Sequence, residues 1–256
     1  MKMSKNLEDY IKEKIKIGGP INIESFMSIS LNDKKQGYYI KSTPIGKDND
    51  FITAPEVSQM FGELIAVWLL DTWNKIGKPK INIIELGPGN GFLMQDIIRV
   101  AKNFPIFLTN ISLWVYEINE ELSKKQEKNI EHNFKRIDSL EKLPNGINFI
   151  IANEFFDAIP IRQYMYDTKF WHERLIDINK DGEFYLINKK LNSKELENIG
   201  FLENTYQSNL IYETSPEQDK ILKLLLKNIY TNGGLLIFDY AKVIHGFGDT
   251  LQALSR

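Results

Sequence analysis

The residue spacing with the clearest chemical meaning is the loop Glu85-Leu86-Gly87-Pro88-Gly89-Asn90-Gly91, which lies between a short apolar run and a helix-like segment. Glycine allows the backbone to adopt positive φ and to approach a ligand closely. A helix that begins directly after such a loop offers free N–H groups to an anionic group. The loop therefore predicts the binding of a nucleotide-like cofactor, with an ordinary tight turn as the alternative.

The glycine spacing and the acid before it narrow the kind of cofactor. A dinucleotide fingerprint, G-x-G-x-x-G, would place its third glycine where this chain has Phe92, and the spacing here is G-x-G-x-G. Glu85 precedes the first glycine, at a position where a carboxylate can help to hold the ammonium group of a methionine. We therefore predict S-adenosylmethionine rather than a nicotinamide or flavin, held by Glu85, Gly87 and Gly89.

Further cofactor contacts are predicted where the next two strands end. Glu117 follows a strand-like run, and its carboxylate can accept two hydrogen bonds from ribose hydroxyls. Asp138, Ser139 and Leu140 follow the next run, where an adenine would lie and an acid can accept a bond from its amino group. The alternatives are an exposed acid at a strand end for Glu117 and plain turn chemistry for the Asp-Ser pair.

The segment from Asn153 to Pro160 follows a fourth strand-like run and carries the candidate acceptor site. Ligands of an open parallel sheet lie beyond the carboxyl ends of its strands, so Asn153, Glu154 and Asp157 are predicted to be catalytic residues that face the methyl donor. A sulfonium already carries an activated methyl group, so the enzyme mainly aligns the acceptor and excludes water. Two acids suit a cationic acceptor such as guanidinium. Capping of a helical turn is the alternative for both acids.

The pattern around these residues predicts the elements that position them. Strand-like and helix-like segments alternate from residue 81 to residue 240, and continuous apolar strands are typical of a parallel sheet buried on both faces. We expect an α/β fold with a doubly wound, Rossmann-like sheet. The strands are expected at 81–84, 112–116, 134–137, 147–152 and 235–240, and the helices between them at 92–101, 120–133 and 215–230.

The flanking segments follow other patterns. Residues 1–78 are expected to form an N-terminal helical extension, with helices at 5–17, 23–31 and 58–76, and residues 79–256 the Rossmann-like domain. An antiparallel insertion is expected at about 162–190. The run Lys124–Glu131 predicts a solvated helix face. The apolar stripe of the helix at 58–76 is expected to consist of Phe61, Leu64, Ile65, Trp68, Leu69 and Trp73.

Composition limits the classes of function. The 256 residues include 32 basic and 34 acidic side chains, so there is no basic surplus for binding nucleic acid. The absence of cysteine removes disulfides, thiolate catalysis and cysteine-based zinc sites, and the three histidines lack metal-ligand spacing. No run approaches the roughly 20 apolar residues of a membrane span, and the N-terminus has no targeting pattern. We expect no metal, no nucleic-acid partner, no membrane span, and a bacterial cytoplasmic location ahead of a mitochondrial one.

Several motifs together resemble the MidA-like family of S-adenosylmethionine-dependent methyltransferases, which includes a mitochondrial arginine methyltransferase that assists the assembly of respiratory complex I. The stretches around Thr53–Ser58 and Asn153–Pro160 are far more specific than the glycine loop. The matching stretches lie in order along almost the whole chain, at Gly37–Tyr39, Asp50–Ser58, Phe61–Leu64, Glu85–Gly89, Ala152–Pro160 and Gly248–Gln252.

The resemblance implies a class I methyltransferase fold, with an arginine of a complex I subunit as the acceptor in the mitochondrial member. It also favours cofactor contacts from Pro55 and Glu56, for which a capped helix start is the alternative. The family pattern continues beyond Gln252, so the last strands of the sheet are expected to be missing. Two other functions stay open. One is a non-catalytic remnant or an assembly-binding module, and the other is a small-molecule methyltransferase on the same fold.

Overall fold

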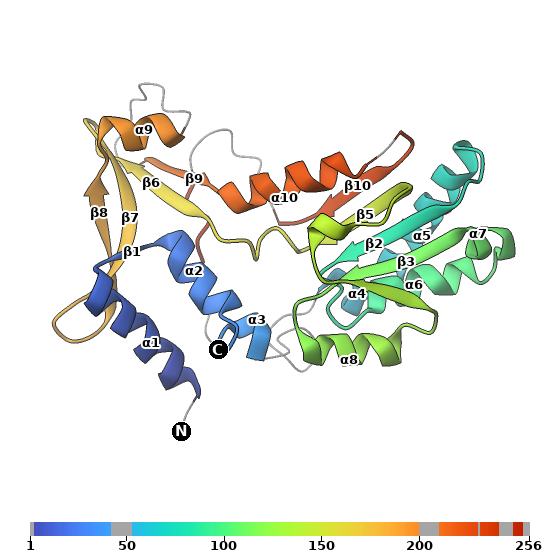
Figure 1. The fold of residues 1–256 in the computed structure, drawn as a ribbon, viewed down its shortest axis with the longest axis horizontal. Coiled ribbons are helices and arrows are strands. Elements are labelled where there is room, and N and C mark those ends of the chain that lie inside the picture. Colours follow the sequence, from blue (N-terminus) through green and yellow to red (C-terminus); the bar gives the residue numbers. More distant parts are fainter. Residues whose placement is uncertain (1–2, 42–52, 200–209, 230, 241–247, 253–256) are drawn as a thin grey trace. The chain divides into compact units, whose positions relative to one another are not determined.

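The computed structural model describes residues 3–41, 53–199, 210–229, 231–240 and 248–252 (Figure 1). The chain divides into two compact units, each built from separate segments. We call residues 38–158 and 218–240 the parallel-sheet unit, and residues 1–37, 159–217 and 241–256 the antiparallel unit.

The described residues of the parallel-sheet unit form five strands in the order β10-β5-β2-β3-β4, and every neighbouring pair is parallel. In chain order, β2 comes first and lies in the middle of the sheet. The strands β3 and β4 follow on one side of β2, and β5 and β10 lie on the other side. This order confirms the predicted doubly wound sheet. The strands are β2 (Ile81–Leu86), β3 (Ile111–Tyr116), β4 (Phe134–Ile137), β5 (Ile147–Asn153) and β10 (Gly234–Phe238).

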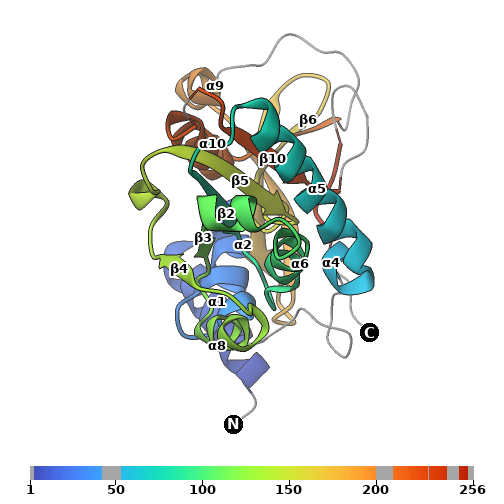
Figure 2. The same cartoon turned by 90° about the vertical axis from the view of Figure 1, so that its right-hand side faces the viewer.

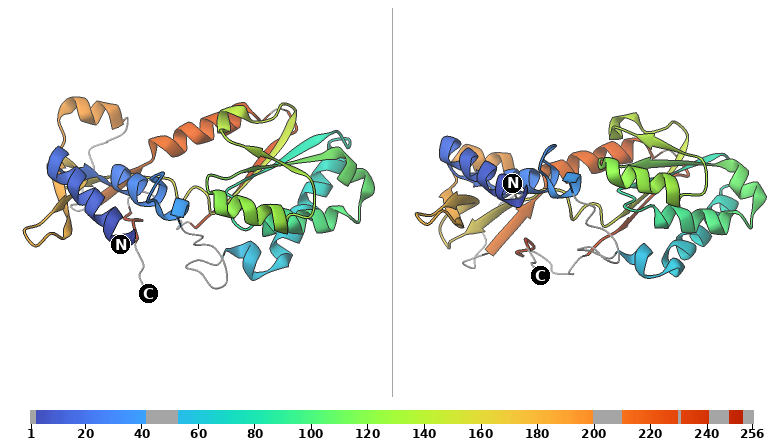
Figure 3. Two further views of the ribbon diagram at one scale, coloured as in Figure 1. Left: turned by 60° about the horizontal axis from the view of Figure 1, so that its bottom comes forward. Right: turned by 90° about the horizontal axis from the view of Figure 1, so that it is seen from below.

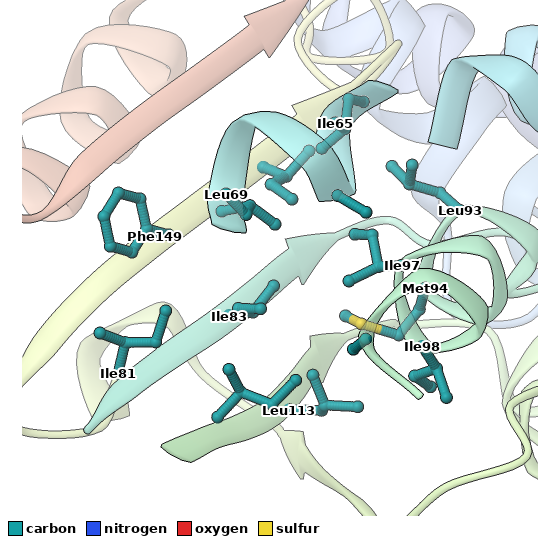
Figure 4. Packing of buried hydrophobic residues seen from close by; sticks show 14 of the residues in the cluster. Ile65, Leu69, Ile81, Ile83, Leu93, Met94, Ile97, Ile98, Leu113 and Phe149 are labelled. Carbon is teal, nitrogen blue, oxygen red and sulfur yellow. The ribbon is translucent and has the colours of Figure 1, made fainter. Parts of the chain in front are cut away.

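Helices of this unit bury one face of the sheet. The long helix α5 (Gln59–Lys75) and the helix α6 (Phe92–Ala101) lie on the same side of the strands (Figure 2). Their apolar side chains, such as Leu69 and Ile97, pack with Ile83 and Leu113 of the sheet in one core (Figure 4). The other helices of the unit are α3 (Tyr38–Lys41), α4 (Ala54–Val57), α7 (Pro105–Asn110), α8 (Glu120–Asn129) and most of α10 (Pro216–Lys227).

The contact between α5 and α6 depends on Gly62. A Cβ atom at this position would lie 2.5 Å from the Cβ of Asp96 and 2.7 Å from its Oδ2. Arg99 of α6 then joins the two helices, because its guanidinium lies 3.0 Å from Glu63 and 2.8 Å from Asp96. The Phe61–Leu64 motif thus supplies a close approach of two helices and the ion pair beside it.

The predicted apolar stripe of α5 is only partly correct. Ile65, Leu69 and Trp73 are buried as expected, but Leu64 is 63% exposed and Trp68 is 39% exposed. The reason is that the buried face of the helix is centred on Gly62, Ala66, Leu69 and Trp73, where small residues allow close packing. Trp68 still makes an edge contact with Phe149 of β5 at a ring-centroid distance of 5.9 Å.

The antiparallel unit contains β1 (Ile21–Asn22), β6 (Arg162–Tyr166), β7 (Trp171–Ile178), β8 (Phe184–Lys190) and β9 (Leu210–Thr214). Its strands pair antiparallel, with β7 next to β6, β8 and β1, and β9 next to β6. The helices α1 (Met3–Gly18) and α2 (Ile23–Asn32) lie beside this sheet (Figure 3). They pack against it through a core that includes Ile15, Ile23 and Ile176. The helix α9 (Ser193–Ile199) completes the described part of the unit.

The two units divide the chain at places other than the expected boundary at residue 78. Residues 1–37 belong with the antiparallel insertion because β1 pairs with β7, whereas α5 belongs with the parallel sheet. The insertion also extends beyond residue 190, because β9 pairs with β6. Pairings between segments so far apart in the chain leave no local pattern in the sequence.

Side-chain hydrogen bonds join the Gly248–Gln252 motif to the strands of the antiparallel unit. The fully buried Gln163 donates to Asp249 at 2.8 Å, and Arg174 donates to the same carboxylate at 2.8 Å. The hydroxyl of Thr250 donates to Glu213 of β9 at 2.6 Å. The motif therefore has a structural role in the described part of this unit.

The substitution Gly62→Ala tests the close approach of α5 and α6. We expect it to lower the free energy of unfolding by about 1–3 kcal/mol, because the new Cβ overlaps Asp96 and the helices must separate. Urea unfolding followed by circular dichroism measures this change. Gly18→Ala is the control, because no atom lies within 4 Å of its added Cβ. Equal stability of the two variants would contradict this explanation of Gly62.

Candidate active site

The carboxyl ends of the parallel strands bring the predicted site residues to one edge of the sheet. Leu86 at the end of β2 pairs with Tyr116 of β3 and with Ala152 of β5. The residues that follow these strands, including Gly87 and Glu117, must therefore emerge side by side. This edge is where open parallel sheets bind their ligands.

The glycine loop after β2 requires glycine for two reasons. Gly87, Gly89 and Gly91 have φ angles of +62°, +54° and +86°, which residues other than glycine rarely adopt. Space is also limited, since a Cβ at Gly87 would lie 3.2 Å from the ring of Phe155 and one at Gly91 would lie 3.0 Å from Ile130. Gly91 is the residue before α6, so the loop feeds directly into the N-terminus of that helix.

Glu85 is a buried acid just before this loop, with only 3% of its surface exposed. Its Oε2 atom is buried and has no hydrogen-bond partner among the described residues. Burial, followed by the charges of Glu117 and Asp96, raises the pKa of Glu85 to about 8, although a backbone N–H of Met94 partly opposes this. An unpaired buried carboxyl oxygen is costly, and a cationic ligand would remove that cost.

Glu117 follows β3 and is held in place by two donors. Its carboxylate accepts hydrogen bonds from the backbone N–H of Asn119 at 2.8 Å and from the side-chain amide of Gln126 at 3.2 Å. Burial raises the pKa of Glu117, and both of these hydrogen bonds oppose that rise. The carboxylate keeps further lone pairs with which it can accept bonds from ribose hydroxyls.

The predicted adenine contacts after β4 are less buried. The side chain of Asp138 is 83% exposed and lies 3.4 Å from Lys142. Ser139 caps a short 3-10 helix, Leu140–Lys142, by accepting a bond from the N–H of Glu141, while Leu140 is buried. This geometry fits the turn alternative for Asp138 and Ser139, and the adenine contact stays a prediction.

The helix α4 lies beside the glycine loop. Asn90 in the loop donates to Glu56 Oε1 at 2.6 Å, and the other carboxyl oxygen of Glu56 is buried without a partner among the described residues. Pro55 occupies the first turn of α4. The backbone N–H of Ala54 donates to the carboxylate of Glu154, so α4 contacts both the glycine loop and the segment after β5.

The segment after β5 gathers acids that the sequence places far apart. Asn153 ends β5, and Glu154 follows with a positive φ of +49°, its N–H bound to Phe238 of β10 at 2.8 Å. Burial and the charge of Asp157 raise the pKa of Glu154, and burial and the charge of Asp239 raise the pKa of Asp157. Asp239 directly follows β10 but was not predicted to be a site residue. It accepts bonds from the N–H groups of Phe156 and Asp157 at 3.2 and 3.1 Å.

Tyr39 is a second group that sequence analysis did not assign to the site. Burial, followed by the charges of Asp157 and Glu154, raises the pKa of its phenol to about 12. Its carbonyl accepts a hydrogen bond of 2.6 Å from the side chain of Asn119, the residue that caps α8. Its only signal in the sequence was its place in the Gly37–Tyr39 motif.

Comparison with known proteins identifies the family. The model of the family described as "Putative S-adenosyl-L-methionine-dependent methyltransferase" matches residues 64–256. The chain belongs to this family. The family match confirms the predicted cofactor class, since its members are described as dependent on S-adenosylmethionine.

Similar proteins include curated relatives and a solved structure. Protein arginine methyltransferase NDUFAF7, mitochondrial, from Xenopus laevis is 33% identical over 89% of this chain and 58% of its own length. The Drosophila melanogaster homolog of that protein is 30% identical over 98% of this chain and 63% of its own length. The chain thus spans about three-fifths of the length of these relatives.

A protein from Burkholderia thailandensis, described as a likely methyl transferase and solved with bound S-adenosyl-homocysteine, has the same fold. Its TM-score is 0.77 at 20% identity, over 89% of this chain and 60% of that one. The class I methyltransferase fold is thereby confirmed. The expectation of a cytoplasmic location ahead of a mitochondrial one is contradicted, because the curated relatives that match are mitochondrial by name.

Two further findings concern membrane spans and metal sites. Among the residues with described positions, no helix is long and apolar enough to cross a membrane. Within the same residues, no group of three or more His, Asp or Glu side chains is arranged to hold a metal ion.

The raised pKa of Glu85 predicts proton release when the cofactor binds. At about pH 6.5 this carboxyl is mostly protonated, and it must ionise to pair with the cofactor's ammonium. We expect S-adenosylmethionine binding to release close to one proton and to tighten as the pH rises toward 8. Calorimetry in buffers of different ionisation enthalpy measures the proton count.

Glu85→Gln should abolish the release, and the exposed-site control Glu131→Gln should retain it. Release that persists in Glu85→Gln would refute the assignment.

The glycine loop and Glu117 predict a second binding result. We expect Gly87→Val and Glu117→Ala each to weaken S-adenosylmethionine binding by about tenfold or more, the first through the positive φ and Phe155, the second through lost ribose contacts. Equilibrium dialysis with labelled S-adenosylmethionine measures the affinity. Gly182→Val is the control for strain, since Gly182 has a φ of +82° in the antiparallel unit. Unchanged affinity in both site variants would exclude this site.

Proposed function

We propose that this protein is an S-adenosylmethionine-dependent methyltransferase that methylates an arginine side chain of a protein. The observation that carries the acceptor is the group of carboxyls formed by Glu154, Asp157 and Asp239 at the carboxyl ends of β5 and β10. The names of the curated relatives, which are protein arginine methyltransferases, support the same acceptor.

The residues around the glycine loop fit the proposed cofactor. The unpaired oxygen of Glu85 suits the ammonium of the methionine part, and Glu117 suits the ribose hydroxyls. The positive φ angles of the loop let its backbone approach the cofactor, with Pro55 and Glu56 of α4 beside it. When bound, S-adenosylmethionine supplies a methyl group already activated by its sulfonium charge.

The acids after β5 have two tasks in this proposal. Arginine stays protonated in water, so Glu154 and Asp157 orient the guanidinium by charge-assisted hydrogen bonds. Methylation of a protonated guanidinium nitrogen displaces one of its protons. A carboxylate whose pKa is raised by burial and by a neighbouring acid is a better acceptor for that proton. Asn153 lies at the same strand end and is proposed to contact the acceptor.

The proposed physiological substrate is an arginine of a respiratory complex I subunit. This part rests on the resemblance of the motifs to the MidA-like family and on the names of the mitochondrial relatives. The acidic group supports a cationic acceptor of any size. The choice of a protein substrate is therefore supported by the resemblance and by the names of the relatives.

The acceptor is tested by following methyl transfer to complex I purified from cells that lack the gene. We expect methyl-labelled S-adenosylmethionine and this protein to produce methylarginine, identified by mass spectrometry. Glu154→Gln and Asp157→Asn should each lower the rate by about 10²-fold or more while cofactor affinity stays within about threefold. Asp181→Asn, in an exposed turn, is the control.

Three outcomes would count against this proposal. Methyl transfer to lysine or to a small molecule instead of arginine would contradict the acceptor. Cofactor binding without any methyl transfer would favour a binding module. Full activity of both acid variants would remove Glu154 and Asp157 from the acceptor site.

A further inference from the structure

Gln126 of α8 is a fully buried polar side chain between two parts of the candidate cofactor site. Its amide nitrogen donates to the carbonyl oxygen of Gly89 at 2.8 Å and to Glu117 Oε2 at 3.2 Å. Its amide oxygen accepts a hydrogen bond from Arg136 Nη1 at 3.2 Å. One side chain thus contacts the glycine loop after β2 and the carboxylate after β3.

The chemistry of these three contacts suits an amide. Gly89 and Glu117 present acceptors, whereas Arg136 presents a donor, so only one orientation of the amide satisfies all three. A carboxylate would place a third acceptor against Gly89 and Glu117. An apolar side chain of the same length would leave the buried acceptors without this donor, which is costly.

The surroundings hold the amide in this orientation. Arg136 is itself fixed, because it donates to the carbonyl of Ser123 and lies 3.2 Å from Glu127. The side chain of Gln126 also packs against Gly91, where an added Cβ would lie 3.4 Å from its Cγ. The hydrogen bonds of Gln126 therefore fix the distance between the glycine loop and Glu117.

We propose that Gln126 is a positioning residue that couples the glycine loop to Glu117, so that the methionine part and the ribose of the cofactor are bound in one geometry. The proposal rests on the cofactor site of the proposed function. Gln126 acts through Gly89 and Glu117, and Arg136 acts by keeping the amide in the productive orientation. The run Lys124–Glu131 was predicted to be a solvated face, but Gln126 and Ile130 are its buried members.

The substitution Gln126→Glu tests the amide directly. At pH 8 the new carboxylate faces two acceptors, one of them the charged Glu117, and we expect S-adenosylhomocysteine to bind about tenfold or more weakly. Protonation of the introduced carboxylate restores one donor, so the loss should shrink as the pH falls toward about 5.5. Calorimetric titration with S-adenosylhomocysteine from about pH 5.5 to 8 measures the profile. Lys125→Ala, a partly exposed neighbour, is the matched control and should follow the wild-type profile.

Arg136→Met supplies a milder variant that leaves Gln126 in place. We expect it to weaken S-adenosylhomocysteine binding about threefold or more through loss of the amide's orientation. In the Glu117→Gln background, Gln126→Glu should lose most of its pH dependence, because the opposing charge is gone. Circular dichroism of each variant without ligand confirms folding.

The outcomes separate the two proposals. Wild-type affinity of Gln126→Glu at pH 8, or an equal loss at every pH that persists in the Glu117→Gln background, would overturn the positioning role alone. If neither the wild type nor Lys125→Ala binds S-adenosylhomocysteine, the proposed cofactor site fails as well.

Discussion

The candidate site depends on the parallel pairing of β2 with β3 on one side and β5 on the other. That register sets Leu86 beside Tyr116 and Ala152, so the chain leaves all three strands at the same edge. A shift of one residue would turn Glu85 to the opposite face of the sheet. Both faces are buried, with Ile83 and Ile84 fully covered, so the hydrophobic core strongly disfavours such a shift.

The same arrangement buries the polar side chains of Glu85 and Gln126 and partly buries that of Glu117. Glu85 has an unpaired oxygen among the described residues, and Glu117 and Gln126 are held by hydrogen bonds rather than by solvent. Burial, followed by the charges of Glu117 and Asp96, raises the pKa of Glu85, so the free protein loses stability as the pH rises through the neutral range. A ligand with an ammonium group and hydroxyls would satisfy these groups, which is the physical basis for assigning the cofactor to this edge.

Local patterns were sufficient to predict much of the fold. The segments 92–101 and 134–137 form a helix and a strand with the expected bounds, because their apolar periodicity and flanking turns lie within a few residues. The places of the glycine loop and Glu117 directly after two strands of the parallel sheet were also predicted, and their contacts with the cofactor stay predictions.

The contacts that were missed join segments far apart in the chain. Tyr39 binds Asn119 across 80 residues, and Asp239 binds the N–H of Asp157 across 82. The pairing of β1 with β7, which places residues 1–37 in the antiparallel unit, is of the same kind. Gln126 was missed for another reason: it is a buried residue within the run Lys124–Glu131, whose other members are mostly charged. Such contacts follow from tertiary structure, so spacing alone does not predict them.

The carboxyl ends of β2, β3 and β5 are proposed to form one cofactor site. Amide hydrogen exchange with and without S-adenosylhomocysteine, read by mass spectrometry, measures whether the ligand binds there. We expect slower exchange in peptides that cover residues 85–92, 117–122 and 153–157, with no change in the β7–β8 hairpin. Protection confined to the antiparallel unit, or no protection at a saturating ligand concentration, would contradict it.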